Sequence, residues 1–268
     1  MQSRQRSWPA AVSPRRGIAA LLAGLALFTL TTGVRADDAS KILKSMSDYV
    51  TAGKNISISF DTDIEVVTSD LQKVQFASSG QVLLSRPDKL RISRSGGYSD
   101  VELVFDGKTL TILGKHLNSY AQKDVTGTID QLVDAVRDRD NIVLPGADLL
   151  LSRVYDELSG EVTDAKHVGQ GVIDGVECEH LAFRTPDVDW QLWVETGARP
   201  IPRKYVITSK QIAGAPQYTL RIKEWNNDAT IPADAFVFKP PADAKKVELS
   251  AMAGIDEVPA GQATGAKK

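Results

Sequence analysis

The sequence has little of the side-chain chemistry on which catalysis and metal binding depend. It contains one cysteine, Cys178, and three histidines among 268 residues. A single cysteine cannot form a disulfide within the chain, and three histidines supply few general bases. The sequence also lacks a Gly-rich phosphate loop, a Gly-x-Ser-x-Gly nucleophile elbow and a His-x-x-x-His pair. We therefore expect a protein that catalyses no reaction and holds no metal or other cofactor.

The few reactive groups that lie close together in the sequence have structural as well as chemical interpretations. Cys178 and His180 face the same way on a strand, with His167 nearby. A metal site needs three or four converging ligands, so we favour structural roles and expect Cys178 to be buried. An intermolecular disulfide is the alternative for that cysteine. Asp187 and Asp189 resemble the paired carboxylates of a hydrolase, but the Thr-Pro-Asp sequence around them favours a turn.

The N-terminus has the order of features that is typical of a secretory signal peptide. Four arginines precede an uncharged apolar run at 17–34, and Ala36 is followed by two aspartates. We expect residues 1–36 to be a signal peptide that is cleaved after Ala36. A permanent membrane anchor is the alternative, because the run approaches the minimum length for crossing a bilayer. The signal predicts a protein of the Gram-negative periplasm.

The chain that remains after cleavage is acidic. Removing residues 1–36 removes five arginines and no acidic residue, which leaves 27 basic and 34 acidic side chains and a net charge of −7. This charge disfavours binding to nucleic acid or to anionic lipid surfaces. The length suits one domain at 37–249. Residues 250–268 have the composition of a disordered tail.

Alternating apolar and polar residues predict two series of strands. The first series comprises 56–60, 63–67, 74–84 with a break at 78–80, 90–92, 101–105 and 109–113. The second series comprises 161–167, 171–176, 178–184, 190–195, 202–210, 217–225 and 236–238. The sequences Asp106-Gly107 and Asp174-Gly175 predict tight turns, because glycine tolerates the positive φ that such turns need.

Helical periodicity is present at 39–52, 128–139 and 145–155, and Thr126 or Thr128 is a candidate N-cap. Helices that interrupt many antiparallel strands predict an α+β fold, mainly antiparallel β. We expect a curved half-barrel sheet with helices covering its concave face, and an apolar cavity between the layers. The apolar stripe at 128–139 suits a movable lid as well as a permanently packed helix.

Three segments resemble the LolA/LolB superfamily of periplasmic lipoprotein carriers. They are GQVLLSRPDKLRI at 80–92, VFDGKTL at 104–110 and IPADAFVFKPP at 231–241. They are similar to the carriers' strand–Arg-Pro–strand element, their Asp-Gly-Lys hairpin and their closing Phe-x-Phe-x-Pro-Pro strand. The resemblance spans residues 39–248, and the chain looks more closely like a family of predicted periplasmic proteins of unknown function.

The resemblance implies roles for particular residues. Arg86 matches an arginine that hydrogen-bonds the helical lid and holds it shut; without the resemblance, a surface arginine is an equal interpretation. Segment 126–155 matches the lid. Leu90 and Ile92 match positions where the carriers place large aromatics, so the pocket is expected to differ in shape. The expected cavity lining is Val82, Leu84, Leu90, Ile92, Leu103, Phe105, Leu110, Ile112, Ile129, Leu132, Val133, Val136 and Leu150.

Two functions follow from this interpretation. The first is a periplasmic binding or carrier protein for a hydrophobic ligand, a lipid or a lipoprotein acyl chain, without stable membrane insertion after cleavage. The alternative is a protein-interaction or sensor module of the cell envelope with the same fold and no transported ligand. A filled interface between sheet and helices would favour the second function. A hydrolase is the least favoured interpretation, because no nucleophile–base pair is visible.

Overall fold

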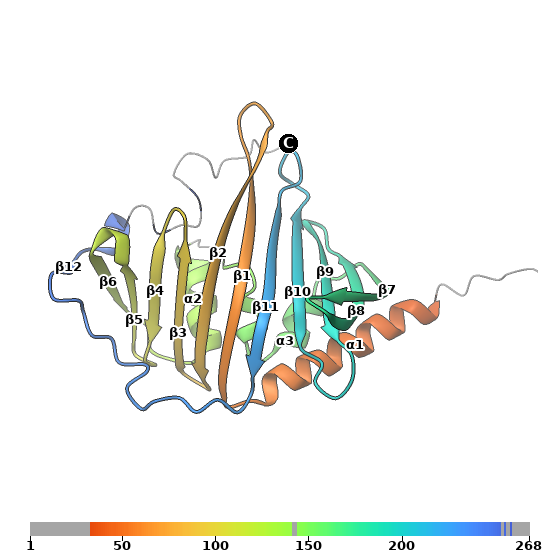
Figure 1. Ribbon diagram of the computed structural model, residues 1–268, viewed down its shortest axis with the longest axis horizontal. Coiled ribbons are helices and arrows are strands. Elements are labelled where there is room, and N and C mark those ends of the chain that lie inside the picture. The colour runs from red at the N-terminus through yellow and green to blue at the C-terminus, as the bar shows by residue number, and fades with distance from the viewer. Residues whose placement is uncertain (1–32, 141–143, 253–254, 256–257, 259–268) are drawn as a thin grey trace, which may run out of the picture. The chain divides into compact units, whose positions relative to one another are not determined.

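A computed structural model describes residues 33–140 and 144–252 together with Ile255 and Val258. The predicted signal peptide lies outside the described residues up to position 32. The described strands form one twelve-stranded sheet, shown in Figure 1. They are β1 Asn55–Val67, β2 Lys73–Ser85, β3 Lys89–Gly96, β4 Asp100–Phe105, β5 Thr109–Gly114, β6 Ser119–Asp124, β7 Asp164–Ile173, β8 Val176–Arg184, β9 Val188–Glu195, β10 Pro202–Ser209, β11 Gln217–Asn226 and β12 Lys245–Lys246.

The helical elements are the long helix at the start of the described residues and several shorter helices further along the chain. They are α1 Gly33–Ala52, the 3-10 helix η1 Lys115–Leu117, α2 Ile129–Asp140, the 3-10 helix η2 Ala147–Leu150, α3 Val154–Ser159 and the 3-10 helix η3 Leu249–Ala251. The helix predicted at 145–155 is therefore two short helices, η2 and α3. They are separated at Leu151, whose backbone is extended.

The sheet consists of two antiparallel meanders joined at its centre. Its strand order is β12-β6-β5-β4-β3-β2-β1-β11-β10-β9-β8-β7, and the junction is the antiparallel pair of β1 with β11. Only the short β12 runs parallel to its neighbour among the described strands. The sheet is open and curved, and the helices cover its concave face (Figure 1). This architecture confirms the predicted fold class.

Local sequence explains the tight turns. At the β4–β5 turn, the carboxylate of Asp106 accepts hydrogen bonds from the backbone N–H groups of Lys108 and Thr109, at 2.9 and 2.8 Å. Gly107 has a φ of 91°. At the β7–β8 turn, Asp174 and Gly175 have φ values of 49° and 83°, as a two-residue hairpin of mirror-image type requires. Both predicted turns are confirmed.

The first two strands are longer than the sequence pattern indicates. Residues 61–62 and 78–80 do not break them, because β1 and β2 pair continuously from Asn55 opposite Ser85 to Val67 opposite Lys73. The hydroxyls of Thr62 and Ser78 are 2.6 Å apart and hydrogen-bonded across the pair. Polar residues at these positions therefore join the strands instead of ending them.

The strand predicted at 236–238 is wrong. This segment forms no strand. The backbone carbonyl of Ala235 accepts a hydrogen bond from Arg91. Arg91 alternates with Leu90 and Ile92 of the concave face, so its side chain, and the segment that it binds, lie on the convex side of the sheet. Phe236 is buried and the Phe238 ring packs against Tyr120, with ring centroids 5.1 Å apart. Phe236 and Phe238 thus cover a sheet face while Val237 between them is exposed, an alternation with the same local signature as a strand.

Gly80 allows β1 and β3 to approach β2 closely. A Cβ atom at this position would lie 2.4 Å from the ring of Phe60 and 2.6 Å from the backbone oxygen of Ser93, whereas a Cβ at Gly97 would meet nothing within 4 Å. We predict that Gly80→Ala lowers the free energy of unfolding by about 1–3 kcal/mol through overpacking. The control Gly97→Ala changes it by less than about 0.5 kcal/mol. Urea titration followed by circular dichroism measures both, and equal effects would contradict the close approach.

Candidate hydrophobic site

The residues that were expected to line a cavity all lie in one apolar cluster. Leu84 and Phe105 are 0% exposed, and nine others are buried with them. Ile92 and Leu103 are partly buried and pack against the same cluster. The structure therefore brings the predicted residues together between sheet and helices, and their contact with a ligand stays a prediction.

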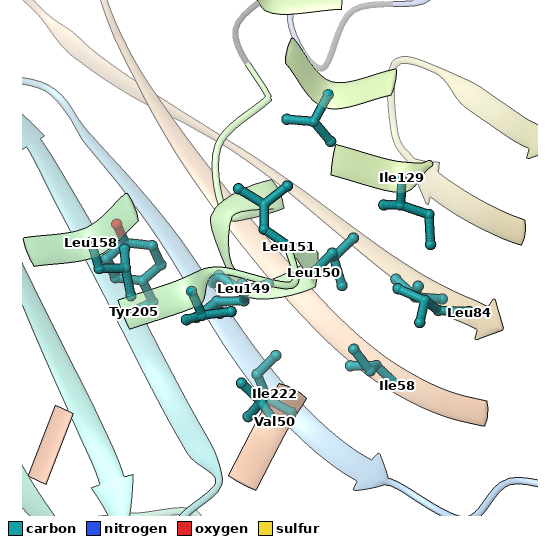
Figure 2. Close-up of a cluster of buried hydrophobic side chains, with 14 of the residues drawn as sticks. Val50, Ile58, Leu84, Ile129, Leu149, Leu150, Leu151, Leu158, Tyr205 and Ile222 are labelled. Carbon is teal, nitrogen blue, oxygen red and sulfur yellow. The ribbon is translucent and has the colours of Figure 1, made fainter. Parts of the chain in front are cut away.

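We call α2, η2 and α3 the helical cover. Figure 2 shows Ile129 and Leu150 of the cover beside Leu84 and Ile58 of the sheet. All four side chains are buried, with exposed fractions of 7% or less. The contact between cover and sheet is apolar at this point, so opening it would expose hydrocarbon on both layers.

Helix α2 begins at a reciprocal pair of hydrogen bonds. The hydroxyl of Thr128 accepts from the backbone N–H of Gln131 at 3.3 Å, and the side-chain oxygen of Gln131 accepts from the N–H of Thr128 at 2.9 Å. This is a capping box, and it confirms Thr128 as the N-cap. The N–H of Ile129 donates to the carbonyl of Pro87 at 2.9 Å, which fixes the start of the cover beside the end of β2.

Ion pairs join the parts of the cover to each other. Arg137 of α2 donates to Asp148 of η2 at 2.8 Å and to Glu157 of α3 at 2.5 Å. Arg153 donates to Asp134 at 2.9 Å. Burial raises the pKa of Asp148, and the charge of Arg137 opposes that rise. These contacts bind the three short helices into one unit.

Arg86 joins the sheet to this unit. It follows β2 directly, and its Nη1 donates to the carbonyl of Leu150 at 2.9 Å. The hydrogen bond implied by the resemblance to the carriers is therefore present, and its function as a latch stays a prediction. Burial lowers the pKa of Arg86, opposed by the charge of Asp130, but a guanidinium stays protonated in either case.

Two hollows lie elsewhere on the molecule. One is at the ends of β2, β3 and β4 beside Phe76 and Tyr98. The other lies across β1, β2 and β3 and includes Gln81 and Ser93, which point away from the concave face because they alternate with Val82 and Ile92. Between cover and sheet, the described apolar side chains belong to one buried cluster, and a cavity there stays a prediction.

The remaining reactive residues have structural partners. Cys178 is buried and free, and burial raises its pKa. His180 stacks on Trp193 with ring centroids 4.1 Å apart, and His167 lies 2.6 Å from the carboxylate of Glu179. Among the residues that the structure describes, no group of three or more His, Cys, Asp or Glu could hold a metal ion.

The two neighbouring aspartates lie at the β8–β9 turn. The backbone N–H of Thr185 donates to the carbonyl of Val188 at 2.9 Å and closes this turn. Asp189 accepts from Arg184 at 3.0 Å, and Gln211 donates to Asp187 at 3.2 Å. The structure thus supports the turn interpretation of Asp187 and Asp189.

Half of the apolar interior was absent from the predicted lining. Strands β8 to β11 and helix α1 contribute buried side chains to the same cluster. They include Leu43, Met46, Val50, Leu181, Phe183, Trp190, Leu192, Val194, Tyr205, Leu220 and Ile222. The alternation at 190–194 is a signal for part of this set. No local signal places those strands beside β1 in the same sheet, because the β1–β11 pair joins distant parts of the chain.

A family model for predicted periplasmic proteins, DUF2092, matches residues 39–250. The chain belongs to this family. Membership places the protein in the periplasm, the compartment that the sequence predicts. No helix in the described part of the chain is long and apolar enough to cross a membrane. A search of curated proteins found no match.

Several solved structures are similar to this chain of the DUF2092 family. An uncharacterised conserved protein from Thermus thermophilus is 12% identical, with a TM-score of 0.46, covering 79% of this chain and 99% of its own. MucB in the MucA/MucB complex of Pseudomonas aeruginosa is 15% identical, with a TM-score of 0.45 and coverages of 78% and 63%. A LolA superfamily protein from Nitrosomonas europaea is 10% identical, with a TM-score of 0.37 and coverages of 75% and 97%.

We predict that Arg86→Met loosens the cover locally. Hydrogen bonds of charged groups contribute about 1.5–3 kcal/mol, so the amides of Leu149 and Leu151 should exchange hydrogen at least about tenfold faster. The control Arg184→Met removes an exposed arginine that pairs with Asp189 and should leave both amides unchanged. Unchanged exchange in Arg86→Met, measured by NMR, would rule out the latch.

The raised pKa of Asp148 predicts a pH dependence of stability. The folded protein holds the Asp148 proton at a higher pH than the unfolded chain does, so ionisation of this group destabilises the fold. The free energy of unfolding of the wild type, relative to Asp148→Asn, should therefore fall as pH rises through the raised pKa. Urea titrations at a series of pH values test this, and a difference that is constant or rises with pH contradicts it.

Proposed function

We propose that the protein is a periplasmic binding protein that holds an acyl chain between the helical cover and the concave face of the sheet. One observation carries this proposal: a cover whose parts are joined to each other by ion pairs meets the sheet through an apolar contact. Closing such a contact is favourable because it buries apolar surface, and a hydrocarbon ligand can take the place of the buried contact when the cover opens.

The free energy gained by burying an acyl chain is large enough for binding. Each buried methylene contributes about 0.8 kcal/mol, so a chain of about twelve carbons gains at most about 10 kcal/mol. Because the apolar side chains of cover and sheet are buried in one cluster, entry of the chain requires the cover to move outward. The acyl chain thus shifts the equilibrium toward the open arrangement by as much as its affinity for the open form exceeds that for the closed form.

In this proposal the protein catalyses no reaction. Cys178 is a buried thiol whose pKa is raised, which disfavours the reactive thiolate. His167 and His180 are occupied by Glu179 and Gln191. The role is to remove an acyl chain from water and release it again.

A protein-interaction module is the second candidate, and an exposed edge strand favours it. Strand β7 lies at an edge of the sheet, and Val168 and Val172 on it are 51% and 65% exposed. An edge strand with exposed apolar side chains can pair with a strand of another protein. In that case the cover would remain closed and no acyl chain would bind.

We predict that the purified protein binds sodium dodecanoate with one-to-one stoichiometry in calorimetry and that its thermal stability rises with the ligand concentration. Leu150→Asn places a polar amide in the apolar contact and should weaken binding at least about tenfold. The matched control Val168→Asn changes an exposed position on β7 and should leave affinity unchanged.

Circular dichroism of both variants separates loss of binding from loss of fold. Absence of binding by the folded wild type would contradict the carrier function and leave the interaction module. Equal weakening in both variants would place the ligand outside the contact between cover and sheet.

A further inference from the structure

Arg86 has two buried donors that its protein neighbours do not use. Its Nη1 donates to the carbonyl of Leu150, but Nε and Nη2 are inaccessible to solvent and have no acceptor among the described residues. Nε and Nη2 form one edge of the planar guanidinium, and their parallel N–H groups fit the two oxygens of a carboxylate. The unused edge is therefore one that is suited to an anion.

The acidic side chain whose charge acts on Arg86 is that of Asp130, and it is already engaged. Its Oδ1 accepts from the backbone N–H of Ser152 at 2.9 Å, and its Oδ2 accepts from the hydroxyl of Ser152 at 2.5 Å. Arg153 lies 3.5 Å from the same oxygen. Asp130 affects Arg86 as a nearby charge, while no ion pair between them is present among the described contacts.

The charged edge lies next to the apolar contact between cover and sheet. Leu84 precedes Arg86 by two residues and is fully buried, and Leu150 supplies the carbonyl that Nη1 binds. Figure 2 shows Leu84 and Leu150 near Ile129 of the cover. An extended chain with a charged end can therefore have its hydrocarbon among these residues and its head group at Arg86.

We propose that Arg86 binds the carboxylate of an acyl ligand through Nε and Nη2 while the acyl chain lies between sheet and cover. This inference rests on the proposed function and specifies the ligand as a fatty acid or another acyl chain that ends in a carboxylate. Buried donors without acceptors cost free energy, and a carboxylate supplies acceptors for both Nε and Nη2. The same guanidinium holds Leu150, so it links recognition of the head group to the position of the cover.

Two ligands with the same chain test the proposal. Sodium dodecanoate and 1-dodecanol share twelve carbons and differ in the head group, so the ratio of their affinities isolates the contribution of the carboxylate. We expect the wild type to bind dodecanoate at least about tenfold more tightly at neutral pH, since hydrogen bonds to charged groups are the strong ones. Sodium acetate, a carboxylate without a chain, should not compete at the same concentration.

Variants then assign the preference to Arg86. In Arg86→Met the preference for dodecanoate should disappear. Loss of the hydrogen bond to Leu150 acts on both affinities together and therefore cancels in their ratio. Arg86→Lys keeps the charge without the paired edge and should retain an intermediate preference. The control Arg184→Met should keep the full preference, and circular dichroism confirms that each variant is folded.

The outcomes are distinct. Equal affinity of the wild type for the two ligands, or a preference that persists in Arg86→Met, overturns the role of Arg86 and leaves the proposed function standing. Competition by acetate alone would show a simple anion site and overturn the acyl ligand. If the folded wild type binds neither twelve-carbon ligand, the proposed function fails and this inference fails with it.

Discussion

The concave face of the sheet is apolar across most of its width, and it must be kept from water. No single element covers it. Helix α1 packs against β7, β8 and β9, while α2 lies over the first meander and Leu158 of α3 lies beside Tyr205 of β10 in the second (Figures 1 and 2). Burial of this face is the main favourable term that holds the layers together, and the pairing of β1 with β11 brings both halves of the face into one surface.

Arg86 supplies a side-chain hydrogen bond between the sheet and the cover. The ion pairs of Arg137 and Arg153 connect parts of the cover to each other, so they keep it in one piece without fixing it to the sheet. Arg86 lies where β2 ends and the cover begins, and one donor of its guanidinium binds the cover while two remain unused. In the proposed function, this donor holds the closed cover and is released when the cover opens.

Much of the architecture could be predicted from the sequence because its signals are local. Alternation along the strands, the Asp-Gly turns and the Thr128 cap all depend on residues within a few positions of each other. Strand β6 has no alternating apolar pattern in the sequence, because Ser119–Asp124 is largely polar. The parallel strand β12 is held through backbone hydrogen bonds of Lys245 and Val247 with the region of β6, and such pairing has no local sequence signal.

For the same reason, only half of the candidate site could be predicted from the sequence. Residues of the first meander and α2 were identified from periodicity and family resemblance, and all of them lie in the cluster. The second meander and α1 enter it through long-range pairing that no single segment encodes. How closely the cover packs on the sheet is also beyond the sequence, since the same apolar stripe serves an empty cavity and a packed contact.

We propose that the cover moves away from the sheet to admit an acyl chain, and a distance measurement tests this movement most directly. Asp156 on α3 and Gln81 on β2 are exposed positions for spin labels in a Cys178→Ser background. With saturating dodecanoate, pulsed electron paramagnetic resonance should show a longer distance between the labels than in the free protein, because the acyl chain must separate side chains of cover and sheet that are buried in one cluster. A distance distribution that stays the same while dodecanoate is bound would contradict the account.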